Sequence, residues 1–215
     1  MYKKTSKIYC FGGNYWYVVE EDDEKLVLVD TDCKIGDEEL KTPWSDQKND
    51  LSKQENGQCI LDYCNSLADK YFACFKDAII PREVTAGTGR IENAYIWPMS
   101  KDEFKKVRVE SGRIMMEVLD SVWTRTLSKD SKDSKDNCHA WRVNSSNGNF
   151  SDSCGVNDVC HVAPALCLKK SEIYFTAEGK IELDAKDSIK ADPCSPFSKK
   201  AVFKRTVKNF KKALS

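Results

Sequence analysis

The chain has 215 residues, 40% of them hydrophobic, and its 34 basic and 34 acidic side chains cancel to a formal net charge of zero. That length supports one sizeable core, and the balanced charge excludes a chain-wide attraction to nucleic acid. The basic N-terminal residues precede no apolar run of signal-peptide length, and no span of about 18 apolar residues occurs. The sequence therefore predicts a soluble domain without an export address and leaves its location open.

Cysteine and histidine usage argues against a metal centre. There are ten cysteines and two histidines, and no two cysteines have the CysXXCys spacing. Because the usual zinc spacings are absent, we predict neither a metal site nor a cofactor, and we expect mostly reduced thiols. Cys59, Cys64 and Cys74 fall in a predicted helical segment, where core positions are expected.

The first third of the chain predicts a β-meander. Residues 7–13 and 15–20 suggest a strand, a turn and a second strand, and residues 25–30 supply a third strand after an acidic turn. The polar residues 31–56 are predicted to be loop, with Trp44 as a packing anchor.

A helix is predicted from residue 59 to residue 75. Its apolar residues recur at steps of three or four and are Ile60, Cys64, Leu67, Tyr71 and Phe75. Pro81 disfavours helix in the residue before it. The GlyThrGly at 87–89 lacks the Lys and Ser/Thr of a phosphate-binding loop and the third Gly of a dinucleotide fingerprint, so we interpret it as a turn.

A buried strand is predicted at 93–98, followed by a short second helix. Ser100 and Glu103 have the spacing of a capping box, and Phe104 and Val107 supply the inward face. The SerLysAsp repeat at 128–136 is polar and of low complexity, so we expect a solvated loop there.

Residues 123–168 organise the rest of the chain. Lys, Glu, Gln and Met make up roughly a fifth of the sequence, yet none occurs from Asn137 to Leu168, where chance would give about seven. A buried strand also sheds Lys and Glu. That explanation fits Ala163 to Leu168 but not the Asn, Ser, Asp, Cys and His residues before them. All the residue types in these polar runs can be encoded by codons ending in C whose first two bases are free, the set reached by randomising the adenines of Asn codons.

The segment resembles the variable region of variable proteins from diversity-generating retroelements. The resemblance lies in TrpThrArg at 123–125, AlaTrpArgValAsnSer at 140–145, AsnGlyAsnPhe at 147–150 and ValAlaProAlaLeu at 162–166. This frame is similar to a domain of unknown function with a TrpTrpLeuArgSerPro element and a GlyValArgProAla ending. The chain departs from it at Val122, Leu127 and Ala163, which stand in place of Trp, Pro and Arg.

The resemblance implies an α+β, C-type-lectin-like (formylglycine-generating-enzyme-like) fold of short antiparallel strands and two helices. It also implies a ligand-binding function, in which a protein or glycan target meets a hypervariable surface on a phage, virion or cell. The expected variable positions are Asn137, Cys138, His139, Ser151, Asp152, Ser153, Cys154, Asn157, Asp158, Val159, Cys160 and His161. The expected scaffold residues are Trp123, Arg125, Trp141, Val156 and Pro164, helped by Arg142 and residues 163–166.

The chain is predicted to close with a hairpin and a basic tail. Residues 173–175 and 180–183 suggest two strands about the turn at 178–179, completing a domain over residues 1–185. Residues 186–215 form a linker and tail with seven basic and no acidic side chains between 199 and 212, and with apolar residues gathered on one helical face. Such a helix can dock on protein, lie on a membrane surface or contact nucleic acid, and we favour docking on this domain or on a partner.

Two other functions remain open. The first is an enzyme with a nucleophile and a base, such as Cys154 with His161, although no spacing singles this pair out and we predict no catalytic activity. The second is a structural protein that assembles through its basic tail, in which case oligomers are expected.

Overall fold

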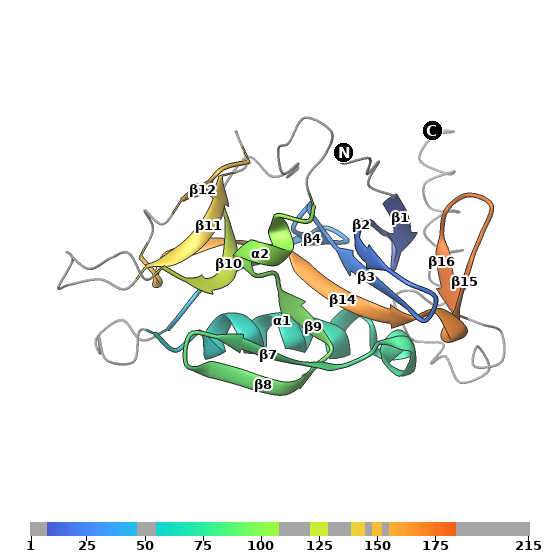
Figure 1. The fold of residues 1–215 in the computed structure, drawn as a ribbon, viewed down its shortest axis with the longest axis horizontal. Helices are drawn as coiled ribbons and strands as arrows, with labels where there is room; N and C mark the ends of the chain where they lie inside the picture. The colour runs from blue at the N-terminus through green and yellow to red at the C-terminus, as the bar shows by residue number, and fades with distance from the viewer. Residues whose placement is uncertain are drawn as a thin grey trace, which may run out of the picture.

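The computed structural model of the protein describes residues 8–46, 55–107, 121–128, 139–144, 148–151 and 155–183. They form a mixed α+β fold of short, mostly antiparallel strands with two α-helices (Figure 1). This confirms the predicted α+β class. The SerLysAsp repeat beyond Ser128 and the tail at 186–215 lie outside these residues. Within them, no helix is long and apolar enough to cross a membrane.

One five-stranded sheet contains the predicted meander. Its order is β1-β2-β3-β14-β9, with every pair antiparallel, and its strands are β1 (Ile8–Phe11), β2 (Asn14–Glu21), β3 (Lys25–Val29), β14 (Pro164–Lys169) and β9 (Ile96–Pro98). The first five residues of β14 are all buried. An interior strand covered on both faces has this continuous apolar pattern, which explains the ProAlaLeuCysLeu run.

A second five-stranded sheet carries most of the predicted variable segment. Its order is β12-β11-β10-β13-β6, formed by β12 (Phe150–Ser151), β11 (Ala140–Asn144), β10 (Ser121–Leu127), β13 (Val159–Val162) and β6 (Lys41–Pro43). The β10–β13 pair is parallel and the others are antiparallel. Only Ala163 separates β13 from β14, so one continuous segment serves both sheets.

The longer helix, α1 (Gln58–Tyr71), lies against β9 and the β7–β8 hairpin (Figure 1). It buries Ile60, Cys64 and Leu67, as the spacing predicted. It ends at Tyr71, earlier than predicted, and the 3-10 helix η2 (Ala73–Ala78) follows. Phe75 therefore sits in η2, where its ring meets Phe11 edge-on at a centroid distance of 4.5 Å. Among the predicted helical cysteines, Cys64 is buried, whereas Cys59 and Cys74 are only half-buried.

The short helix α2 (Lys101–Phe104) has the predicted capping box. The Ser100 hydroxyl accepts the Glu103 N–H at 3.1 Å, and the Glu103 carboxylate accepts the Ser100 N–H at 2.7 Å. Two otherwise exposed amides are satisfied in this way, which fixes where the helix starts. Phe104 and Val107 are buried, also as predicted.

Three small hairpins complete the described residues. They are β4 (Lys34–Ile35) with β5 (Glu38–Glu39), β7 (Arg82–Ala86) with β8 (Gly89–Ala94), and β15 (Ile173–Phe175) with β16 (Ile181–Leu183). The 3-10 helix η3 (Lys170–Glu172) precedes β15. The closing hairpin is confirmed. The loop prediction for 31–56 was wrong at β4, β5 and β6. The predicted strand at 93–98 is divided between the end of β8 and β9.

The GlyThrGly turn joins β7 to β8, as predicted, and packs against the start of α1. Gly87 has a φ of +56°, and a Cβ atom there would lie 1.8 Å from the Glu55 carbonyl oxygen. Glycine is required because both the left-handed backbone and the close approach exclude a side chain. The turn is thereby a packing element between hairpin and helix.

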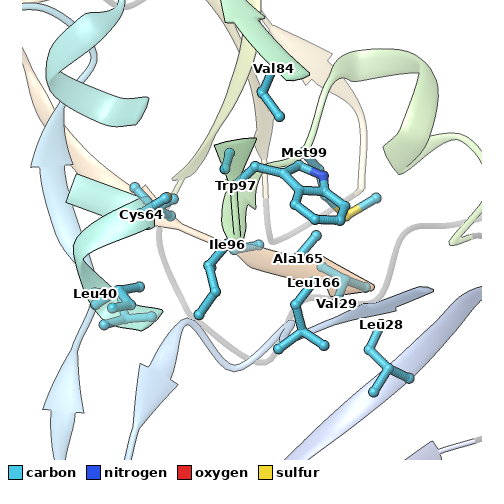
Figure 2. Close-up of a cluster of buried hydrophobic side chains, with 14 of the residues drawn as sticks. Leu28, Val29, Leu40, Cys64, Val84, Ile96, Trp97, Met99, Ala165 and Leu166 are labelled. Carbon is cyan, nitrogen blue, oxygen red and sulfur yellow. The ribbon is translucent and has the colours of Figure 1, made fainter. Parts of the chain in front are cut away.

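The core lies between α1 and the first sheet and continues under β10. Figure 2 shows residues of β3, α1, β9 and β14 meeting there, with the Trp97 ring beside Met99 and Val84. Trp16, Trp44, Trp97 and Trp123 are all at most 1% exposed. The prediction that Trp44 is a packing anchor is confirmed.

Candidate ligand-binding face

Two buried tryptophans connect the predicted frame to the first third of the chain. The Trp123 indole N–H donates to the Thr42 carbonyl at 3.2 Å, and the Trp44 indole N–H donates to the Thr124 carbonyl at 3.0 Å. A buried indole N–H needs such a partner, because its desolvation is otherwise uncompensated. These bonds fix β10 against residues 42–44 and place Trp123 in the core, as expected of a scaffold residue.

Arg125 connects the same strand to α2. Its Nη2 atom lies 2.9 Å from the Glu103 carboxylate, and its own backbone N–H donates to the Met99 carbonyl at 2.9 Å. Both side chains are about one-sixth exposed. Burial lowers the pKa of the Arg125 guanidinium, and the Glu103 carboxylate opposes that shift. Arg82, at 3.2 Å, is a second cation on this carboxylate. Glu103, which belongs to the capping box of α2, is therefore also the counter-ion of Arg125.

Trp141 lies on β11 and is held by contacts from β10 and α2. The Thr124 hydroxyl donates to its carbonyl at 2.8 Å, and the Lys101 ammonium stands 3.0 Å from its ring centroid. The same ammonium is 5.4 Å from the ring centroid of Phe150 on β12. A cation over an aromatic face is attracted by the ring quadrupole. Lys101 therefore joins α2 to the outer strands, a role that the sequence analysis missed because the two partners are 40 residues apart.

Two parts of the predicted variable segment lie next to each other at the second sheet. His139 and Gly155 form an isolated antiparallel bridge, which brings the start of β11 next to the turn that leads into β13. On that turn Asn157 is half-buried and Asp158 is exposed, and Val159 follows with 61% of its surface exposed. Ser151, half-buried, pairs with Arg142 at the sheet edge. Val156, on the same turn as Asn157, is completely buried.

Cys160 and His161 correct the predicted face. Their exposed fractions are 5% and 4%, so neither side chain is presented at the surface. Successive side chains of a strand point to opposite sides, so the burial of both residues means that both sides of β13 are covered at this point, whereas Val159 at the start of the strand is exposed. Polar composition alone had suggested exposure. His161 Nε2 lies 3.9 Å from the Glu39 carboxylate, which also binds Lys41 at 2.8 Å; that lysine lowers the pKa of Glu39.

Among the described residues, the predicted variable positions that are not buried are His139, Ser151, Asn157, Asp158 and Val159. We refer to these five residues as the β11–β13 face. The other predicted variable positions, Asn137, Cys138, Asp152, Ser153 and Cys154, lie outside the described residues. The scaffold residues Trp123, Val156 and Pro164 are buried, Arg125 is mostly buried and Trp141 is half-buried.

Within the described ranges, no group of three or more His, Cys, Asp or Glu side chains could hold a metal ion. Comparisons of the whole chain with protein-family models, curated proteins and solved structures find no match.

Proposed function

We propose that the protein is a ligand-binding variable protein of a diversity-generating retroelement, with a C-type-lectin-like fold and a surface diversified by adenine-directed mutagenesis. The observation that carries this proposal is the absence of Lys, Glu, Gln and Met from Asn137 to Leu168. Those four residue types cannot arise from an Asn codon ending in C when its adenines are replaced. In the rest of the chain they are common, so composition alone does not explain the gap.

The contrast between exposed and buried positions supports a division into ligand face and scaffold. Asp158 and Val159 are exposed on the β11–β13 face, whereas Val156 and Val162 on either side of them are fully buried. Substitutions away from packed positions usually change stability by under about 0.5 kcal/mol. The exposed positions can therefore accept many side chains while the core beneath them stays unchanged.

The C-type-lectin-like fold is proposed on three features together. An antiparallel meander opens the domain, a long helix packs against the edge strand β9 of the same sheet, and the chain returns to the meander through β14. A closing hairpin then contacts β1 through the Cys10–Lys180 bridge. This arrangement agrees with the short antiparallel strands and two helices expected from the resemblance.

The ligand class that we propose is a protein or glycan at a cell or virus surface. A face built from a mixture of imidazole, hydroxyl, amide, carboxylate and aliphatic side chains has no single charge sign, which does not favour nucleic acid as primary ligand. Several copies displayed together would raise the overall affinity without new contacts.

The neighbouring DNA tests this proposal directly. We expect a near-copy of the segment that encodes Asn137 to Leu168, differing from it almost only where the copy has adenine, together with a reverse-transcriptase gene. A faithful copy, or no copy, would refute the retroelement assignment. Replacing Cys154 and His161 with alanine tests the enzyme alternative, which requires loss of a measurable turnover without loss of folding.

A further inference from the structure

Asp30, the residue after β3, has a carboxyl group that is completely buried. Its Oδ1 atom accepts the Asp32 N–H at 2.9 Å, and its Oδ2 atom accepts the Asn14 side-chain amide at 3.2 Å. Asn14 also donates to the Lys34 carbonyl and accepts the Gly36 N–H at 3.2 Å. Among the described residues, every hydrogen bond to the Asp30 carboxyl therefore comes from a neutral amide.

The groups that face this carboxyl do not neutralise its charge. Asn14 faces it from β2, the Asp32 carboxylate and the Cys33 thiol belong to the same turn, and β4 contributes the Lys34 amide. The Lys34 ammonium is directed to Glu39, at 3.9 Å. From β14 the uncharged Pro164 carbonyl accepts the Asp30 backbone N–H, and from α1 the Cys64 thiol lies near Cys33.

Burial raises the pKa of Asp30 from 3.8 to about 7, and the nearby Asp32 carboxylate adds to the shift against the opposing amide hydrogen bonds. In an opened turn the carboxyl regains water and its ordinary pKa of 3.8. The closed turn therefore holds the proton more tightly than the open turn. The free-energy advantage that the proton gives to the closed turn is complete below pH 3.8. It falls as the pH rises from 3.8 to about 7, and it is lost above about 7.

The backbone of this turn holds the junction of the two sheets on both sides of Ala163. The Asp30 N–H donates to the Pro164 carbonyl at 3.0 Å, which fixes the start of β14. The Cys33 carbonyl accepts the Leu40 N–H at 2.8 Å, and the Leu40 carbonyl accepts the Val162 N–H at 2.9 Å, which fixes the end of β13. Opening of the turn therefore breaks the hydrogen bonds that hold the end of β13 and the start of β14, while the other strand pairs of β13 and β14 remain.

We propose that residues 30–40 form a proton-linked latch, closed on the β13–β14 junction when the Asp30 carboxyl is protonated and opening more often once it ionises. This inference concerns the scaffold alone and does not depend on the proposed function. It gives the β11–β13 face a support whose rigidity changes near neutral pH.

Amide hydrogen exchange on the full chain tests the latch. Exchange rates are measured at about pH 5.5 and about pH 7.5 and corrected for the intrinsic pH dependence of exchange. With the two pKa values above, the opening constant of the Asp30, Leu40 and Val162 amides should rise about twentyfold over this interval. The Gly57 amide, which donates to the Ala86 carbonyl at 3.0 Å, is remote from the turn and should not follow.

Two variants make the result specific. Asp30→Asn removes the titrating group, so the pH dependence of the three latch amides should disappear, whereas Asp158→Asn on the exposed turn should leave it intact. If Asp30→Asn does not fold, carbon-detected NMR titration of the wild-type carboxyl groups replaces it, with a midpoint for Asp30 near neutral pH as the expected result. The inference would be overturned if the opening constants of the latch amides did not depend on pH, or if they changed in step with that of Gly57. An Asp30 titration midpoint near 4 would overturn it as well.

Discussion

Replacing Glu103 with glutamine should destabilise the frame of the candidate face by about 2–3 kcal/mol. The carboxylate receives three donors: Ser100 N–H at 2.7 Å, Arg125 Nη2 at 2.9 Å and Arg82 Nη1 at 3.2 Å. Glutamine keeps the shape but removes the charge, and a hydrogen bond to a charged group contributes about 1 kcal/mol more than a neutral one. The Arg125 guanidinium, only about one-sixth exposed, also loses its counter-ion.

The interaction itself can be isolated with a double-mutant cycle. Glu103→Gln, Arg125→Met and the double variant are unfolded in urea, with tryptophan fluorescence as the signal because the buried tryptophans become exposed on unfolding. We expect a coupling energy of about 1.5–3 kcal/mol between Glu103 and Arg125, since both are largely withdrawn from water.

The chain provides a matched control for this cycle. Arg90 and Glu83 form an ion pair with the same residue types and the same 2.9 Å separation, but their side chains are 55% and 53% exposed. Exposed pairs contribute little because water and salt screen them, so their coupling should stay below about 0.5 kcal/mol. Equal coupling in the two cycles, or coupling below about 0.5 kcal/mol for Glu103 and Arg125, would refute the view that burial makes this pair a structural anchor.

Three further outcomes are expected from urea unfolding. Gly87→Ala should cost about 2–4 kcal/mol of unfolding free energy, because its Cβ would meet the Glu55 carbonyl at 1.8 Å. Gly36→Ala, with a φ of +64° but open space around it, should cost about 1 kcal/mol. Similar costs for the two variants would contradict the close-packing argument. Val156→Ala should cost about 1–3 kcal/mol and Val159→Ser under about 0.5 kcal/mol, and the reverse order would contradict the division into scaffold and face. Trp44→Phe should cost at least about 1 kcal/mol through the lost bond to the Thr124 carbonyl, and a neutral effect would argue against that bond.

Local signals predicted the elements that depend on neighbouring residues. The capping box at Ser100 and Glu103 involves residues three apart, so its pattern is complete within a short window. The apolar spacing of Ile60, Cys64 and Leu67 likewise specified the buried face of α1. Its C-terminal end was less well determined, because the pattern continues to Phe75 while the backbone tightens into a 3-10 turn.

Long-range pairing determined what the sequence could not specify. Cys160 and His161 were expected on the face because their neighbours are polar, yet β13 pairs with residues of β10 and β6 that are 39 or more positions away along the chain. The burial of Asp30 also depends on Asn14 and Pro164, which come from two other strands. A carboxylate after an apolar strand gives no local indication of burial.

The single residue between β13 and β14 restricts how this molecule can evolve. Successive side chains of a strand point to opposite sides, so inserting or deleting one residue between Val159 and Pro164 would exchange the sides of Leu166 and Leu168 with those of Ala165 and Cys167. Both sides are buried, so side chains of the wrong size would then meet the core. Length changes are tolerated only before Val159, in the connections that lead to it. New specificities must therefore come from exchanging side chains at constant segment length, a rule that sequencing of natural variants can check.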